Sequence, residues 1–256
     1  NNIGMDINDI SPQLAVEIEG SVLTVKFNRP DKMNSVTFER YRSLTQVFNH
    51  AENSNEIRVI IFSGSGGNFS AGNDINDFVT VVEQQGINRN HDAPAFIDAV
   101  REFTKPIIAA VDGFAVGIGV TLLLYCDLVY VTKEAKFRTP FTQLGLCPEA
   151  AASYILPKMM DHARAAEWLL LGEIITAEQA QSDGVVTRVT DAPLMLAFEK
   201  AKVLSTMSPT ALKETKRLMT FDNETLCKTF DEEMKVFSTC LESEEAREAF
   251  KKFLEK

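Results

Sequence analysis

The stretch from Pro106 to Pro157 constrains the fold of this chain more than any other part of the sequence. It opens with a continuous apolar run, Ile107 to Val111, which is typical of a buried strand, and a second such run covers Leu128 to Val131. A loop containing Pro140 follows, and a helix is predicted to begin at Pro148. Two buried strands joined through a helix predict an α/β core.

The connection between the two strands is a turn with spaced glycines, Gly113, Gly117 and Gly119, which opens into an apolar helix over Val120 to Tyr125. Glycine lets the backbone approach a ligand closely, and the start of a helix leaves N–H groups without partners. A lone carboxylate, Glu149, follows about thirty residues later at the second predicted helix start. This combination of fixed amide donors and one acid predicts a site that creates and holds negative charge.

The remaining sequence divides into two parts. Before the central stretch, strand and helix patterns alternate, with strands at 14–19, 22–28 and 59–62 and helices at 38–48 and 96–103, while 82–94 is polar and poorly patterned. After it, helical periodicity covers 163–171, 177–182, 194–205, 209–218, 224–240 and 244–254. We therefore expect a core over 1–190 and a helical region over 191–256 that makes subunit contacts.

Composition excludes several classes of function. The formal net charge of −10 argues against a nucleic-acid-binding surface. The four cysteines have no CxxC spacing and there are only three histidines, so no metal site is expected. No cationic-then-apolar leader opens the chain, and no run reaches the ~18 apolar residues of a membrane span. We expect a cytoplasmic protein.

A series of short motifs resembles one known family. In order along the chain they are Asn28-Arg29-Pro30 with Asn34-Ser35, Phe69 to Asp74, Asp112 to Gly117, Cys126-Asp127, Gly172 to Ala177, and Pro209 to Leu212. Together they are similar to the crotonase (enoyl-CoA hydratase/isomerase) superfamily over nearly the whole length. The resemblance implies a ClpP-like spiral of ββα turns with a C-terminal helical trimerisation region. It also implies an acyl-CoA thioester as the substrate, no separate cofactor, and a homotrimer or hexamer.

Members of this family stabilise an enolate that forms beside the thioester carbonyl. By position, the resemblance places the two oxyanion donors at the backbone amides of Asn73 and Ile118, each of which follows a glycine. One preorganised donor of this kind can contribute roughly 3 kcal/mol to the transition state. Read without the family pattern, both segments are ordinary strand-to-helix turns.

The acids distinguish the reactions within the family. Its two-glutamate hydratases carry their acids at the positions of Thr121 and Phe141, neither of which exchanges a proton near neutral pH. The remaining acid is Glu149, which follows Pro148 as the base does in the monofunctional Δ3,Δ2-enoyl-CoA isomerases that this chain resembles most. The resemblance therefore implies an isomerase of fatty acid metabolism (β-oxidation) with Glu149 as its catalytic base. An acid that only complements a helix dipole is the alternative for this residue.

One carboxylate is sufficient for an allylic shift, because it can take a proton from C2 and return it to C4. Two effects oppose each other at Glu149. A helix N-terminus would favour the carboxylate, whereas Leu146, Cys147, Ala150 and Ala151 would desolvate it and favour the acid. We expect desolvation to dominate in a closed site.

The resemblance also assigns the substrate-binding positions. They are Lys32 and Met33 in the loop that holds coenzyme A, with Ala71, Gly72, Asn73, Asp74, Ile75, Gly117 and Ile118 around the thioester. Asp74 is also expected to shape its turn or cap a helix, and Asp127 is expected to be structural. Three alternatives to the isomerase remain: a hydratase-like enzyme, an acyl-CoA thioester hydrolase and a non-catalytic acyl-CoA-binding module.

Overall fold

A computed structural model describes residues 10–88 and 90–256 of the chain. Its strands are β1 (Leu14–Glu19), β2 (Val22–Phe27), β3 (Val59–Gly64), β4 (Ile107–Val111), β5 (Phe114–Val116), β6 (Leu128–Val131), β7 (Lys136–Arg138), β8 (Ile175–Thr176) and β9 (Arg188–Val189). Six of them form one sheet in the order β1-β2-β3-β4-β6-β9, in which β1 is antiparallel to β2 and the other pairs are parallel. The predicted hairpin and the predicted strands at 59–62, 107–111 and 128–131 are confirmed.

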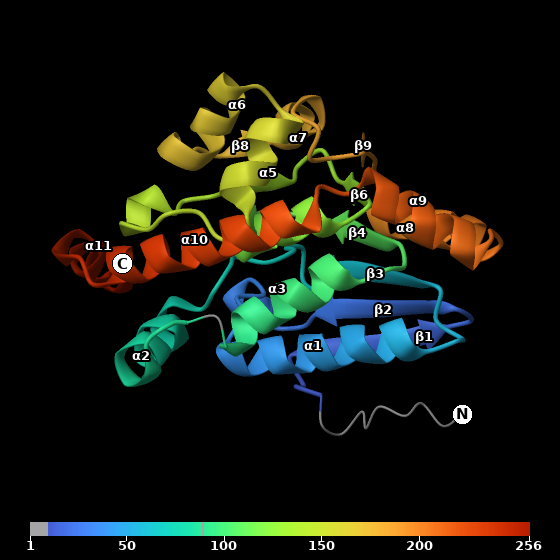
Figure 1. Cartoon of the computed structure of the whole chain (residues 1–256), viewed down its shortest axis with the longest axis horizontal. Helices are drawn as coiled ribbons and strands as arrows, with labels where there is room; N and C mark the ends of the chain where they lie inside the picture. Colours follow the sequence, from blue (N-terminus) through green and yellow to red (C-terminus); the bar gives the residue numbers. More distant parts are fainter. Residues whose placement is uncertain (1–9, 89) are drawn as a thin grey trace.

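Helices cover both faces of this sheet (Figure 1). They are α1 (Phe38–Asn53), α2 (Ile75–Gln85), α3 (Asp92–Glu102), α4 (Ile118–Thr121), α5 (Ala152–Met159), α6 (His162–Ala166), α7 (Ala177–Ser182), α8 (Pro193–Ser205), α9 (Pro209–Met219), α10 (Asn223–Leu241) and α11 (Glu244–Leu254). Short 3-10 turns cover Pro30–Lys32, Leu122–Tyr125 and Thr142–Leu144, and a π-helical turn covers Glu167–Leu171.

The alternation of side chains along the central strands explains the two layers. In β3, Ile60 and Phe62 face the large core under α1 and α3, whereas Val59 and Ile61 face α8 on the other side. A strand that is buried on both faces has no polar side, as the continuous apolar run predicted. The small Ala197 and Ala201 of α8 let that helix pack closely on the sheet.

A smaller sheet includes part of the glycine-spaced turn. It contains β5, β7 and β8, with β5 parallel to β7 and β7 antiparallel to β8. The sequence pattern missed β5, because its three residues lie inside the glycine-spaced turn. The apolar helix expected after that turn is a short α-helix, α4, continued by the 3-10 turn over Leu122–Tyr125.

Two further expectations were wrong. Helix α2 extends to Gln85, so the start of the supposedly unpatterned segment 82–94 is helical, and position 89 lies outside the described residues. The helix expected at Pro148 begins only at Ala152, because Ala150 and Ala151 adopt left-handed backbone angles. Glu149 therefore lies in a turn before the helix and not in its first turn.

The C-terminal helices follow the predicted spacing. Helix α10 crosses the molecule between the α5–α7 layer and α3, and α11 lies beside α2 at the left of the view (Figure 1). Across the described residues, no helix is both long and apolar enough to cross a lipid bilayer.

Candidate active site

Two loops that are far apart in sequence lie side by side at the edge of the small sheet. One contains Ser70 and Ala71, and the other is β5 with the start of α4. The Val116 N–H donates to the Ser70 carbonyl oxygen at 2.9 Å, and the Ser70 N–H donates to the Phe114 carbonyl oxygen at 3.1 Å. This parallel pairing fixes the separation of the two loops by main-chain contacts alone.

Glycines make the close approach possible. Gly72 has a φ of +90°, and a Cβ atom there would lie 2.9 Å from the Val116 carbonyl oxygen. Gly117 has a φ of +58°, which also favours glycine. These two glycines immediately precede the predicted oxyanion donors, so the loops could not hold this geometry with larger residues.

The amides of Asn73 and Ile118 are available to a ligand. Within residues 10–88 and 90–256, neither N–H donates a hydrogen bond to another protein group. The bridge between Val36 and Asn73 uses the carbonyl of Gly72 and the N–H of Asp74, which leaves the Asn73 N–H free of it. Ile118 is the first residue of α4, where an N–H has no partner within the helix.

Both amide-bearing residues line a cavity of about 110 Å³ together with Glu149. Among the described residues that line it, Glu149 is the only one with an ionisable side chain. The others are Ala71, Gly72, Asn73, Ile75, Phe78, Val116, Gly117, Ile118, Pro140, Phe141, Leu144, Leu146, Phe237, Phe250 and Phe253. The cavity is therefore apolar, with one carboxylate and backbone donors.

The environment of Glu149 suits it to take and return a proton. Desolvation by the surrounding apolar groups raises the pKa of Glu149 to about 7, and the charge of Glu233 adds to this increase. The Thr121 hydroxyl donates to Glu149 Oε1 at 3.2 Å and partly opposes the increase in the pKa. The expectation that desolvation dominates is confirmed. A carboxyl with this pKa is poised for general acid–base work near neutral pH.

The predicted substrate-binding residues divide into two groups. Six of them line the cavity with Glu149: Ala71, Gly72, Asn73, Ile75, Gly117 and Ile118. Asp74 does not line it, and instead caps α2 by accepting from the Asp77 N–H and pairs with Arg29 at 2.9 Å.

The other predicted substrate-binding residues lie in the neighbouring loop. Lys32 and Met33 are exposed and outside the cavity, although the Met33 carbonyl oxygen accepts from the Ala71 N–H at 2.9 Å and joins their loop to the cavity edge. Asp127 has the expected structural role, since it accepts from the Ile107 N–H and from Lys216.

Thr121 and Phe141, at which the family resemblance places the acids of hydratases, also lie near Glu149. Thr121 is buried and contacts its carboxylate, and Phe141 contributes an apolar wall of the cavity. No second acid among the described residues takes their place in the cavity lining.

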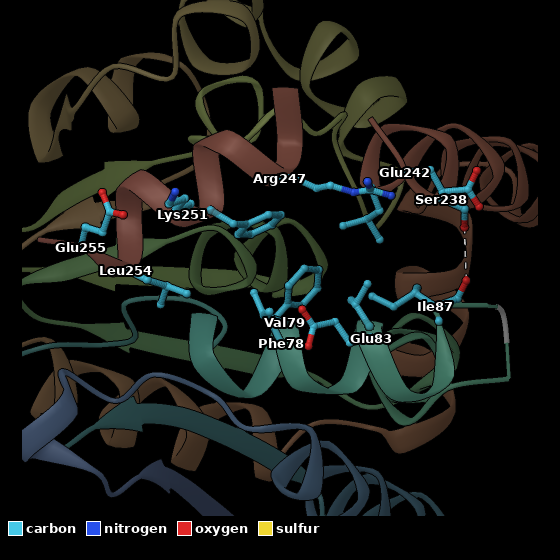
Figure 2. Close-up of a pocket in the computed structure, with 14 residues that line it drawn as sticks. Phe78, Val79, Glu83, Ile87, Ser238, Glu242, Arg247, Lys251, Leu254 and Glu255 are labelled. Carbon is cyan, nitrogen blue, oxygen red and sulfur yellow. Dashed lines mark hydrogen bonds between the residues drawn. The ribbon is translucent and has the colours of Figure 1, made fainter. Parts of the chain in front are cut away.

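Two further cavities adjoin the site. One of about 40 Å³ contains Glu149 and lies between α3 and α10, and it shares Phe78 and Phe237 with the site. A larger one of about 670 Å³ lies between α2 and the C-terminal helices and shares Phe78 and Phe250. Figure 2 shows Phe78, Val79 and Glu83 on α2 facing Lys251 and Leu254 of α11 across this space. Its walls are mostly apolar, with charged groups at the margin.

Sequence reasoning missed the side chains that support the site. Tyr41 donates to the side-chain oxygen of Asn73, and the Tyr125 hydroxyl donates to the Ala150 carbonyl oxygen at 2.5 Å. Glu233 of α10 binds the loop that follows Glu149. No local signal identifies these residues, because each acts on a segment far away in the chain.

Comparisons with known proteins identify the family. Residues 17–256 match the family model described as Enoyl-CoA hydratase/isomerase. "Enoyl-CoA delta isomerase 2" of Rattus norvegicus is 36% identical over 214 residues, which are 82% of this chain and 54% of that protein, so the chain spans about half the length of this relative. "2,3-dehydroadipyl-CoA hydratase" of Escherichia coli is 30% identical over 247 residues, which are 95% of this chain and 96% of that protein.

The fold has close structural counterparts. The structure of Pseudomonas aeruginosa OdaA superimposes with a TM-score of 0.91 at 40% identity and covers 96% of this chain and 100% of that chain. The predicted crotonase fold, an α/β core with C-terminal helices, is confirmed. The relatives include both isomerases and a hydratase by name, so overall similarity alone does not select the reaction.

Proposed function

We propose that this chain, which belongs to the enoyl-CoA hydratase/isomerase (crotonase) family, is a Δ3,Δ2-enoyl-CoA isomerase. The observation that carries the proposal is the content of the reaction cavity. One carboxylate, that of Glu149, shares it with the free amides of Asn73 and Ile118 and with apolar walls.

The reaction needs one group that moves a proton and one place that holds charge. The Glu149 carboxylate takes a proton from C2, and the electron pair of that C–H bond moves toward the thioester oxygen. The N–H groups of Asn73 and Ile118 stabilise this oxygen in the resulting dienolate. Glu149, now the acid, returns the proton to C4, and the double bond moves from C3–C4 to C2–C3.

The same cavity disfavours the addition of water. A paired-carboxylate hydratase needs a second acid to position and activate the water, and Phe141 and Thr121 stand where that family carries its acids. An apolar cavity also excludes water, which protects a dienolate from competing reactions. These observations favour proton transfer within the substrate.

We place the acyl tail in the larger cavity between α2 and α11, because Phe78 and Phe250 connect it to the reaction cavity. A volume of about 670 Å³ is within the range for small-molecule ligands. The coenzyme A arm would leave along the exposed Lys32 and Met33, whose loop adjoins the cavity edge at Ala71.

We further propose that residues 191–256 form the oligomerisation region of a homotrimer or hexamer. Met195, Leu218 and Met219 support this, since their side chains are large, apolar and at least 74% exposed in the single chain. Burial of these side chains in an assembly would remove the exposure.

The test is product analysis with two substrates. The protein is incubated separately with a medium-chain 3-enoyl-CoA and with the corresponding 2-enoyl-CoA, and products are separated by mass and retention time. An isomerase interconverts the two without a change in mass. A product heavier by one water from the 2-enoyl substrate indicates a hydratase, free coenzyme A indicates a hydrolase, and binding without turnover indicates a binding module. Each of these three results would overturn the proposal.

A further inference from the structure

A second glutamate, Glu233 on α10, is buried behind the catalytic loop with a relative exposure of 6%. Glu233 Oε1 accepts from the Ala151 N–H at 2.6 Å, and Oε2 accepts from the Ser153 N–H at 3.1 Å and from the Ser153 hydroxyl at 2.6 Å. Burial of a carboxylate is costly unless hydrogen bonds compensate for it. All three hydrogen bonds come from residues 151–153, so both oxygens of the Glu233 carboxylate are occupied by that short segment.

This segment has an unfavourable backbone conformation. Ala150 and Ala151 have φ angles of +54° and +59°, in the left-handed region that is unfavourable for a residue with a side chain. Neither residue is a glycine, and Ala151, the N-cap of α5, has no side-chain acceptor of its own. A carboxylate from α10 provides the missing cap. The strained turn therefore depends on a contact from a distant part of the chain.

The turn directly controls the direction of Glu149. The Glu149 carbonyl oxygen accepts from the Ala152 N–H at 2.9 Å across the two left-handed residues, and Tyr125 holds the carbonyl of Ala150. If either alanine relaxed to a negative φ, the chain direction at Glu149 would change, and its carboxylate would leave the cavity and the Thr121 hydroxyl.

We propose that Glu233 is a positioning residue, which holds the left-handed Ala150–Ala151 turn and thereby directs the Glu149 carboxylate into the reaction cavity. The proposal rests on the isomerase function proposed above. Glu233 does not line either of the described cavities that contain Glu149, and both of its oxygens are engaged by the loop. It acts through Glu149 and does not contact the substrate.

The experiment uses Glu233→Gln, with Glu232→Gln as the matched control on an exposed position of the same helix. Glutamine keeps the shape but has one acceptor oxygen for donors that now engage two. We expect kcat for the 3-enoyl-CoA to fall about tenfold with KM changed less than twofold, because binding groups are untouched. The control should keep kcat and KM.

A second substitution distinguishes positioning from a general loss of stability. Glycine adopts positive φ at no steric cost, so Ala151→Gly added to Glu233→Gln should restore kcat to within about threefold of the unsubstituted protein. If Glu233 only stabilised the fold, the double variant would not recover kcat, because Ala151→Gly also removes a buried methyl group. Unchanged kcat in Glu233→Gln, or no recovery in the double variant, would overturn the proposal.

Two measurements cover the remaining outcomes. Hydrogen–deuterium exchange of the peptide containing residues 149–153 should rise in Glu233→Gln and not in Glu232→Gln, and unchanged exchange contradicts the proposal. This readout does not require turnover, so it separates failure of the positioning role from failure of the isomerase function. Should Glu233→Gln not fold, Ser153→Ala removes the hydroxyl that donates to Glu233 Oε2 and keeps the Ser153 N–H donor. A kcat loss of about threefold is then expected, and an unchanged kcat also contradicts the role.

Discussion

The two halves of the site are built in different ways. The amide donors of Asn73 and Ile118 lie on loops whose shape comes from glycines and from main-chain pairing between Ser70 and Val116. The proposed base, Glu149, directly precedes two alanines with left-handed backbone angles, which Glu233 and Tyr125 hold from other helical segments. The first half is held by its own main chain, and the second depends on side chains from other elements.

This difference explains which substitutions each half should tolerate. A main-chain donor survives a change of its own side chain but fails when the neighbouring glycine acquires a Cβ atom. A side-chain base fails when its carboxylate is replaced and weakens when its supports change. The following predictions test this contrast, from the largest expected effect to the smallest.

The largest effect is expected for Glu149→Gln. The amide keeps the size of the side chain but cannot accept the C2 proton, so kcat should fall by roughly 10²-fold or more. Binding of coenzyme A, measured by calorimetry, should remain. Glu134→Gln, on an exposed turn, serves as the control. Unchanged turnover would refute the assignment of the base.

Gly72→Ala should cause the next largest loss. A Cβ atom would lie 2.9 Å from the Val116 carbonyl oxygen and displace the Asn73 amide, and loss of one oxyanion donor costs about 10²-fold in kcat. Gly20→Ala is the matched control, because Gly20 also has a positive φ of +61° but nothing lies within 4 Å of the added atom. Equal losses in the two variants would show that backbone strain, and not donor placement, is responsible.

Val79→Trp should alter the preference for chain length. Val79 lines the larger cavity, so a bulky side chain should lower kcat/KM about tenfold for long-chain substrates and leave short-chain substrates nearly unaffected. Thr80→Trp, exposed on the same helix and not part of the lining, is the control. A uniform loss across chain lengths would argue against an acyl tail in this cavity.

The pH profile tests the electrostatics of the base. Because burial raises the pKa of Glu149 to about 7, kcat/KM should be lost as the pH falls through about 7 and not through the ordinary value of 4.5. Thr121→Val removes the hydrogen bond that favours the carboxylate, so the midpoint should move to higher pH and the rate at pH 7 should fall roughly threefold. A midpoint that moved to lower pH would contradict the role of Thr121.

The smallest effect is expected for Asn73→Ala. The backbone amide remains, and the side-chain oxygen of Asn73 only accepts from Tyr41. We expect kcat to fall less than about twofold, with stability lowered by about 1–3 kcal/mol because the buried Tyr41 hydroxyl loses its acceptor. Thermal unfolding measures the second quantity. A loss as large as that of Gly72→Ala would mean that the side chain itself takes part in the reaction.

Much of the fold could be read from periodicity. Continuous apolar runs located β3, β4 and β6, and helical spacing located α8 to α11 within a few residues. The pattern failed where an element was too short to show a period, as in β5. Helix α2 was also missed, although Ile75, Phe78, Val79 and Val82 keep helical spacing there. It also failed at Pro148, where a common helix-start motif precedes a left-handed turn.

The sequence by itself carried the glycines of the two loops, and the family resemblance placed the proposed oxyanion donors at the amides of Asn73 and Ile118. The glycines before Asn73 and Ile118 are local features. A positive φ and a close approach of the two backbones favour glycine, so the residue type itself indicates them. The sequence also showed that the two family positions for hydratase acids hold Thr121 and Phe141, which carry no ionisable group, and that an acid, Glu149, follows Pro148.

Only the tertiary structure decided how that acid behaves. The pKa of Glu149 depends on apolar side chains from several elements, and its direction depends on a buried glutamate of α10 that looks like any other acid of an amphipathic helix in the sequence. Desolvation and long-range hydrogen bonds come from groups that are adjacent in space and not along the chain. Periodicity and local motifs therefore do not predict them.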